Sequence, residues 1–235
     1  MASRIAVIAA HPDDEILGCG GTVARRSRAG DEVVTLIVAE GATSRDVARD
    51  PTARQRNVDA LREAAGKANA ALGVKALEFG GLPDNRLDSR DLLDVVKVIE
   101  VFIAKHRPQI VLTHFPGDLN IDHQIVSRAV STACRPLPAA RVSLMLFFEV
   151  PSSTEWQTNL AGGAFSPNWF EDISSTLPLK LEALRHYDAE MRPWPHPRSY
   201  QGVESLARWR GATIGRQAAE AFSLGRKLVP GDGYE

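Results

Sequence analysis

Short apolar segments alternate with segments of helical periodicity along the 235 residues, and this alternation predicts an α/β fold. The apolar runs at residues 4–10, 32–39, 76–79 and 109–113 have the length of strands, and each leads into a polar loop. Strands that are apolar on both faces are typical of a parallel sheet covered by helices on both sides. We therefore expect a Rossmann-like three-layer sandwich with a mostly parallel sheet, a core strand order of 3-2-1-4, and a single domain over residues 1–235.

The first predicted strand leads directly into the segment Ala10-His11-Pro12-Asp13-Asp14-Glu15. In open α/β sheets, ligands bind at the carboxyl ends of the strands, so four ionisable side chains at this point indicate a metal or acid–base site. The alternative is a strand-to-helix turn in which an Asp caps the next helix. A cap requires only one Asp and no His, so we favour the site.

The segment Gly18-Cys19-Gly20-Gly21 is similar to a dinucleotide-binding glycine motif, but it begins seven residues beyond the strand's last alanine, Ala10. Such a motif lies in the strand-to-helix turn itself, so we interpret these glycines as positions where the helix packs closely on the sheet. Helices are then predicted from apolar spacing at residues 52–72, where Gly73 ends the helix, and at residues 92–106.

A second polar segment follows the strand Gln109–Thr113 and contains His114, Asp118, Asp122 and His123. If the two strands are parallel neighbours, His11, Asp14 and His123 can converge on one ion. Two imidazoles and one carboxylate leave coordination positions open, which is typical of a catalytic metal site. A helix at residues 121–134 would place Asp122 and His123 in its first turn, where an Asp can also be only a capping group.

These two segments, Ala10-His11-Pro12-Asp13-Asp14-Glu15 and Asn120-Ile121-Asp122-His123, resemble the PIG-L/LmbE family of zinc-dependent N-acetylglucosaminyl deacetylases. The resemblance extends from Arg4 to about Leu228, through Leu82-Pro83-Asp84 and Arg192-Pro193-Trp194-Pro195-His196-Pro197-Arg198-Ser199. It implies an amide hydrolase that removes an acetyl group from a 2-acetamido sugar or sugar conjugate, including nucleotide sugars.

The resemblance also implies roles for the charged side chains. Zn²⁺, or another divalent ion such as Fe²⁺, would be held by His11, Asp14 and His123, and it would activate water and polarise the amide carbonyl. Asp13 would be the general base. We expect Asp122 to be the hydrogen-bonding partner of His123.

The chain departs from the family at Asn120, where several members carry a histidine. An asparagine can donate a hydrogen bond to an oxyanion but cannot protonate a leaving amine. Two alternatives stay open: Asp13 returns the proton that it took from water, or His196, between Pro195 and Pro197, is the acid. His196 and Arg198 could instead only bind substrate or pack their loop.

Four residues are candidates for substrate binding: Arg54, Asp84, Glu149 and Arg198. Family members place an arginine near position 54 against the substrate, although arginines on this helix can also form a solvated face. Asp84 matches a family aspartate that contacts the sugar, or it is an Asx-turn residue. Glu149 stands at the end of a predicted strand over residues 144–150.

The C-terminal part, residues 151–228, is expected to form a lid loop at 151–168, a strand at 169–173 and a helix at 177–187. The loop carries Trp156 and Phe165, which could stack on a sugar or plug the core. The prolines of residues 191–199 predict a stiff loop. Residues 199–224 are expected to close the fold as one helix.

A net charge of −1 predicts neither nucleic-acid nor membrane partners, and no segment approaches the roughly 18 apolar residues of a membrane span. The two cysteines are interpreted as reduced core thiols, and the expected location is cytoplasmic. The expected partner is a small N-acetylated sugar, and a homo-oligomer is compatible with the sequence. Two rival functions remain: a non-haem iron enzyme, whose ligand triad is the same, and a non-catalytic sugar- or metal-binding module.

Overall fold

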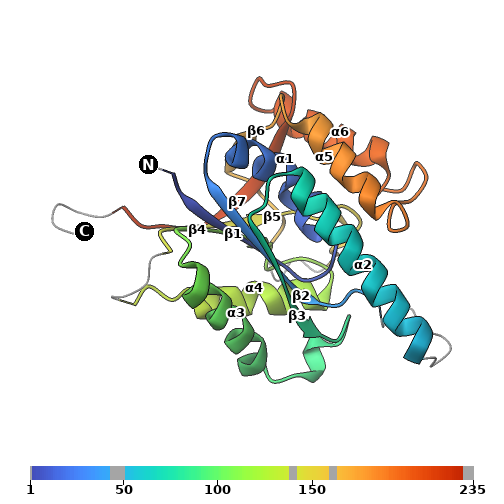
Figure 1. The fold of residues 1–235 in the computed structure, drawn as a ribbon. Helices are drawn as coiled ribbons and strands as arrows, with labels where there is room; N and C mark the ends of the chain where they lie inside the picture. The colour runs from blue at the N-terminus through green and yellow to red at the C-terminus, as the bar shows by residue number, and fades with distance from the viewer. Residues whose placement is uncertain (1, 43–50, 138–141, 159–162, 230–235) are drawn as a thin grey trace.

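A computed structural model describes residues 2–42, 51–137, 142–158 and 163–229, and the side chains of residues 51–54 lie outside the described part. Its centre is one seven-stranded sheet with the order β3-β2-β1-β4-β5-β7-β6 (Figure 1). The first five strands along the chain are parallel, and β7 is antiparallel to both of its neighbours. The strands are β1 (Arg4–Ala9), β2 (Glu32–Ala39), β3 (Ala76–Leu82), β4 (Ile110–His114), β5 (Leu144–Phe148), β6 (Trp169–Asp172) and β7 (Ala219–Lys227).

Helices cover both faces of the sheet and give the three layers that the sequence predicts (Figure 1). Side chains such as Leu17, Leu72 and Leu184 form the core under α1, α2 and α5. On the other face, α3 and α4 contribute Ile99 and Val130 to a second core. The helices are α1 (Asp14–Arg28), α2 (Pro51–Ala71), α3 (Leu92–His106), α4 (Ile121–Ala133), α5 (Leu177–Leu184) and α6 (Tyr200–Ala212), with short 3-10 turns at η2 (Leu87–Ser89), η3 (Thr154–Trp156) and η5 (Arg185–Tyr187).

The predicted core order 3-2-1-4 is confirmed, and it brings the ends of β1 and β4 together. Ile8 in β1 lies opposite Thr113 in β4, so His11 and His114 follow or end neighbouring strands at the same edge. Residues 5–9 are fully buried because β1 has strands on both sides and helices on both faces. This edge is the topological switch point where a ligand site is expected.

The close-packing interpretation of the glycines is also confirmed. A Cβ atom at Gly18 would overlap the ring of Phe148 in β5, and one at Gly21 would lie 2.7 Å from Ile173 Cδ1. The backbone of α1 leaves helical geometry at Cys19, between these two contacts. These glycines therefore serve the contact of α1 with the sheet and the segment after β6 rather than a nucleotide.

The prediction of one helix over residues 199–224 is wrong. Helix α6 ends at Ala212, Gly215 takes a φ of 70°, and the chain returns as β7 between β5 and β6. The return is tight, since a Cβ at Gly211 would lie 2.6 Å from Ala218 Cα. Buried residues 219–222 are apolar except for Glu220, so their spacing does not distinguish a strand from a buried helix.

Glu220 is a charged residue in this interior strand, and its hydrogen bonds explain why it is tolerated there. Its carboxylate accepts hydrogen bonds from the backbone N–H groups of Gly21 and Thr22 at 2.9 and 2.7 Å, and from Lys180 Nζ at 2.6 Å. The pair with Lys180 is buried, so the amide donors supply the compensation that a buried charge requires. Within the described residues, no helix combines the length and the apolar character needed to cross a bilayer.

Candidate active site

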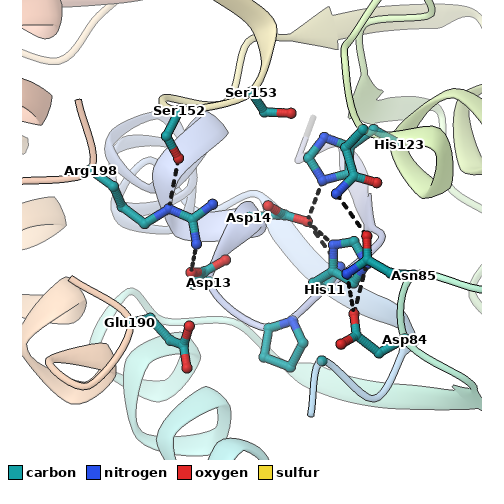
Figure 2. A pocket seen from close by; sticks show the side chains of 13 residues that line it. His11, Asp13, Asp14, Asp84, Asn85, His123, Ser152, Ser153, Glu190 and Arg198 are labelled. Carbon is teal, nitrogen blue, oxygen red and sulfur yellow. Dashed lines mark hydrogen bonds and ion pairs between the residues drawn. The ribbon is translucent and has the colours of Figure 1, made fainter. Parts of the chain in front are cut away.

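Three of the predicted site residues meet in a cavity of about 130 Å³ at the carboxyl edge of β1 and β4 (Figure 2). His11 lies in the turn after β1, Asp14 begins α1, and His123 lies in the first turn of α4. Oδ2 of Asp14 is 3.2 Å from Nδ1 of His11 and 3.2 Å from Nε2 of His123. The three ligand atoms lie within 4.8 Å of one another, as donors to a single ion would.

The protonation states of His11, Asp14 and His123 indicate that this position favours positive charge. Burial lowers the pKa of both imidazoles, but nearby carboxylates outweigh it and raise the pKa of His11 to about 10 and that of His123 to about 9. Burial also opposes ionisation of Asp14, yet the two imidazoles hold its pKa well below the usual range. Without a metal, protons bound to the imidazoles supply the positive charge, and a divalent ion can take their place.

Each imidazole is held from behind by another carboxylate, and here the prediction for Asp122 is wrong. Oδ2 of Asp122 is 3.1 Å from Nε2 of His11, and its Oδ1 accepts the N–H of Leu87 at 3.0 Å. The partner of His123 is Asp118, whose Oδ1 lies 3.1 Å from Nδ1. Adjacent side chains on a helix do not face each other, so Asp122 cannot be the hydrogen-bonding partner of His123.

Asp118 lies in the turn that precedes α4, and hydrogen bonds hold its carboxylate in place. The hydroxyls of Ser153 and Thr154 donate to its carboxylate, and so does the backbone N–H of Asn120 at 2.9 Å. Burial raises the pKa of Asp118, but His123 and the hydroxyls outweigh it and lower the value to about 2. Asp118 therefore stays ionised and orients the imidazole of His123. The sequence reading missed this role, although Asp118 follows a strand end within the second polar segment.

Asp13 points away from the three ligands and toward Arg198 (Figure 2). It is 2% exposed and has a φ of 100°, a strained conformation for a residue with a side chain. Oδ2 accepts a hydrogen bond from Arg198 Nη1 at 3.0 Å. Burial raises the pKa of Asp13 to about 7, with Arg198 opposing the shift and Asp14 adding to it. A carboxyl group with this pKa can gain or lose a proton near neutral pH.

Glu15 holds the strained turn. Its Oε2 accepts the backbone N–H of Asp13 at 3.0 Å, and its Oε1 accepts from Tyr187 Oη at 2.7 Å and from Asn69 Nδ2 at 2.9 Å. Burial raises the pKa of this carboxyl to about 8, against the effect of the Tyr187 hydrogen bond. Tyr187 and Asn69 lie far from Glu15 in the sequence, so no local pattern indicates the contact.

His114 lies beside the His11, Asp14 and His123 group and contacts two parts of the site. Its Nε2 accepts the backbone N–H of Ala10 at 2.8 Å, and its ring stacks on that of His123 at 3.9 Å between centroids. Burial and the neighbouring His123 charge hold the pKa of His114 well below the usual range. The imidazole is therefore neutral, and it packs against the ring of His123.

Two candidate polar residues line the cavity beside His11. Asp84 is buried, and its Oδ1 lies 3.3 Å from Nε2 of His11. Asn120 caps α4 by accepting the N–H of Asp122 at 2.8 Å, and its Nδ2 donates to Asn85 Oδ1 at 3.2 Å. Asn85, Ser152, Ser153 and Glu190 also line the cavity and were not singled out from the sequence.

Arg198 lies in the cavity wall, but His196 does not. Arg198 donates from Nε to Ser152 Oγ at 3.2 Å in addition to its contact with Asp13. Nδ1 of His196 accepts the backbone N–H of Arg198 at 3.1 Å, and its ring packs edge-on against Trp156. The location of His196 thus contradicts its prediction as an acid in the site, and favours the alternative in which it packs the loop that carries Arg198.

Glu149 also lies away from the cavity, contrary to its prediction as a substrate ligand. Both of its oxygens pair with Arg210, at 2.8 and 2.7 Å, because β5 ends beside α6 rather than over the site. Phe165 of the predicted lid packs on Phe115 and Arg210 instead of lining the cavity. Arg54 belongs to the first turn of α2, where side chains lie outside the described residues.

Several proteins that are similar to this chain in sequence or in fold are named deacetylases. Diacetylchitobiose deacetylase of Thermococcus kodakarensis is 31% identical over 97% of this chain and 84% of its own length. The structure of N,N'-diacetylchitobiose deacetylase from Pyrococcus horikoshii matches with a TM-score of 0.76 at 20% identity, over 95% of this chain and 84% of that one. A 4-carboxy-2-hydroxymuconate hydratase from Pseudomonas putida matches with a TM-score of 0.77 at 19% identity, over 98% and 99%.

The hydratase shows that this fold supports more than one reaction, so the fold alone does not select the chemistry. The sequence evidence is more specific. The model of the family described as PIG-L, GlcNAc-PI de-N-acetylase, matches residues 6–134, which include both polar segments of the cavity. Since this match spans more than half of the chain and the Thermococcus relative aligns with nearly all of it, the chain belongs to the PIG-L family.

Proposed function

We propose that this protein is a metal-dependent hydrolase that removes the acetyl group from a 2-acetamido sugar or sugar conjugate. The observation that carries the proposal is the pairing, in one cavity, of a His-Asp-His group, of which only His11 is partly exposed, with a separate buried carboxyl whose pKa is about 7. A ligand set beside a proton acceptor is what amide hydrolysis by activated water requires. Relatives named as deacetylases of acetylated sugars support the same reaction.

His11, Asp14 and His123 would hold Zn²⁺ or a similar divalent ion. Bound there, the ion would lower the pKa of a water molecule and would act as a Lewis acid on the amide carbonyl. Asp118 and Asp122 fix the orientations of the two imidazoles from behind, and the carboxylate behind each ring favours its binding to a cation.

Asp13 is the proposed general base. It lies beside the ligand residue Asp14 in the sequence, but the φ of 100° turns its side chain toward Arg198 and the open cavity. From this position the carboxylate accepts a proton from the attacking water. Arg198 favours the ionised form, which is the form that a base must have.

The same carboxyl is the proposed proton donor to the leaving amine. Asn120 carries an amide, which is not an acid, and His196 lies outside the cavity. Apart from the two predicted metal ligands, the described lining contains no imidazole. Asp13 therefore gives the amine the proton that it took from water, and a pKa near 7 suits transfer in both directions.

Asp84, Asn85 and Asn120 form the polar wall on the far side of His11 and are the proposed contacts for sugar hydroxyls. The rival non-haem iron assignment is disfavoured by the α/β sheet, since such triads usually occur in all-β folds. A non-catalytic binding module has no use for a strained, buried Asp13 beside the ligands, because strain at a site costs about 1–3 kcal/mol.

The test is acetate release from a panel of N-acetylated monosaccharides, disaccharides and nucleotide sugars by the purified, zinc-loaded protein. We expect release from at least one compound, and a loss of roughly 10²-fold or more in kcat for Asp13→Asn with zinc retained. Asp88→Asn, an exposed aspartate in η2, is the control and should match the wild type. Retained zinc with no acetate from any compound would contradict the proposal and favour a binding module.

A further inference from the structure

The turn that follows β5 contacts both halves of the candidate site. Its residues Ser152, Ser153 and Thr154 each carry a hydroxyl group, and we call these three residues the hydroxyl turn. Ser152 and Ser153 line the active-site cavity, and Thr154, the first residue of η3, is buried. Three consecutive hydroxyl groups therefore lie at the cavity or beside it.

On one side of the cavity, the hydroxyl turn holds the partner of a proposed metal ligand. The hydroxyls of Ser153 and Thr154 both donate to the carboxylate of Asp118, in the case of Thr154 over 2.5 Å. The Thr154 hydroxyl also accepts the backbone N–H of Val150 at 2.8 Å, so its single proton points to Asp118. Oδ1 of Asp118 lies 3.1 Å from Nδ1 of His123. Asp118 is fully buried, so bulk water does not replace a hydroxyl donor that is lost.

On the other side, the hydroxyl turn holds the partner of the proposed base. Ser152 Oγ accepts a hydrogen bond from Arg198 Nε at 3.2 Å, and Arg198 Nη1 donates to Asp13 Oδ2 at 3.0 Å (Figure 2). A guanidinium group is planar, so a hydrogen bond at Nε fixes the direction of the N–H groups at its end. Ser152 therefore aims Nη1 at Asp13. The φ of 67° at Ser152 is strained for a residue with a side chain, and such strain is typical of functional positions.

Glu155 holds the strained backbone of the hydroxyl turn. Its Oε1 accepts the N–H of Ser152 at 2.7 Å, and its Oε2 accepts that of Ser153 at 3.3 Å. Ser152 belongs to the contact with the base, and Ser153 belongs to the contact with the metal ligand. Glu155 is exposed and is not among the described residues that line the cavity. A carboxylate outside the cavity therefore stabilises both contacts.

We propose that the hydroxyl turn positions both the metal ligand His123 and the general base Asp13. Its second and third residues act on the ligand through Asp118, and its first residue acts on the base through Arg198. Because the two contacts start at consecutive residues, the turn fixes the two halves of the site relative to each other. The proposal rests on the deacetylase function proposed above and adds positioning residues to it.

Thr154→Val tests the contact with the metal ligand, because it removes the hydroxyl and keeps the shape of the side chain. The zinc dissociation constant, measured by competition with a chromogenic chelator, should rise by about tenfold or more, as is usual when an outer partner of a metal ligand is lost. Thr154→Ser keeps the hydroxyl and should restore the affinity. Ser153→Ala removes the other hydroxyl donor and should also weaken zinc binding, so it decides the question if Thr154→Val does not fold.

Thr176→Val is the matched control for Thr154→Val. Thr176 is a buried threonine at the start of α5, and its hydroxyl donates to the carbonyl oxygen of Gly21 at 2.8 Å. The control therefore also loses a buried hydrogen bond, but its zinc affinity should match the wild type. A wild-type zinc affinity in Thr154→Val and Ser153→Ala, or an equal loss in Thr176→Val, would overturn the contact with the metal ligand.

Ser152→Ala tests the contact with the base. The variant should bind zinc as the wild type does and lose about tenfold or more in kcat for acetate release, because the guanidinium of Arg198 is no longer aimed at Asp13. Ser152→Gly should show the same loss, since glycine relieves the strained φ but also lacks the hydroxyl. An unchanged kcat in both variants, or a loss in Ser152→Ala alone, would overturn the contact with the base.

Glu155→Ala tests whether one turn serves both halves of the site. It should weaken zinc binding and lower kcat together, whereas Glu63→Ala, at an exposed glutamate of α2, should change neither quantity. A change in only one of the two quantities in Glu155→Ala, or in neither, would overturn the joint role of the turn.

Failure of this proposal can be distinguished from failure of the deacetylase function. If the wild type releases acetate from no compound, the function proposed above is wrong, and the contact with the base is overturned with it. The zinc dissociation constants of Thr154→Val and Thr176→Val then still decide the contact with the metal ligand, because they do not depend on activity.

Discussion

Replacing Arg198 by Gln should move the acid limb of the kcat/KM profile to higher pH. Asp13 must be ionised to act as a base, so activity is lost as pH falls through its pKa, which burial places near 7 and which a bound divalent ion would lower. Arg198 Nη1 lies 3.0 Å from Asp13 Oδ2, and its charge favours the ionised form. Without that charge, the pKa of Asp13 is higher. As pH falls, the variant therefore loses activity at a higher pH than the wild type does.

The size of the shift follows from the contact. A hydrogen bond to a charged group contributes about 1.5–3 kcal/mol, and one pKa unit corresponds to about 1.4 kcal/mol. The Arg198 side chain is 19% exposed, so solvent weakens the pair only in part. We therefore expect a shift of about one to two pH units.

The assay is the pH dependence of kcat/KM for acetate release, with metal content measured on the same samples. Arg198→Lys should leave the acid limb close to that of the wild type, because lysine keeps the positive charge beside Asp13. Arg208→Gln is the control, since Arg208 is an exposed arginine on α6 that pairs with Glu204. An acid limb in Arg198→Gln that coincides with the wild type, at equal metal content, would refute the view that Arg198 sets the pKa of the base.

Three further predictions concern the metal and the strained turn. Asp14→Asn should lose zinc on dialysis whereas Asp13→Asn keeps it, and equal metal content by elemental analysis would contradict this division of roles. Zinc binding near pH 7.5 should release protons from the two ligand imidazoles, because their pKa values are raised to about 10 and 9. Zinc affinity should therefore fall as pH falls. Calorimetry in buffers of different ionisation enthalpy measures the number of protons released. Tyr187→Phe removes a hydrogen bond to Glu15 and should lower the free energy of unfolding by about 1 kcal/mol, whereas an unchanged urea midpoint would show that the contact is dispensable.

The parallel half of the sheet could be predicted because its strands carry a strong local signal. Residues such as Val33 and Ile37 are buried on one face while Val34 and Val38 are buried on the other, so β2 is a continuous apolar run. The antiparallel end lacks this signal. Strand β7 contains Glu220 and continues past Phe222 into exposed residues, and only its pairing with β5 and β6 makes it a strand.

In the candidate site, too, some residues could be predicted from the sequence and others could not. His11, Asp14 and His123 could be predicted because each lies in a polar segment that follows a strand end, and the strand order brings the two segments together. The partners of these residues could not. Asp118 reaches His123 through the turn before α4, and Asp122 reaches His11 from the first turn of α4, so both contacts depend on tertiary placement.

The two adjacent aspartates show how this placement gives neighbouring groups different chemistry. Asp14 lies between two imidazoles that hold its pKa well below the usual range, so it stays a carboxylate suited to a cation. Asp13 is turned to the other side by its positive φ, and burial raises its pKa to about 7, where it can exchange protons. Pairs of titratable groups with diverging pKa values are typical of sites that separate electrostatic and proton-transfer roles. Glu15 accepts the N–H of Asp13 and so stabilises the turn on which this divergence depends.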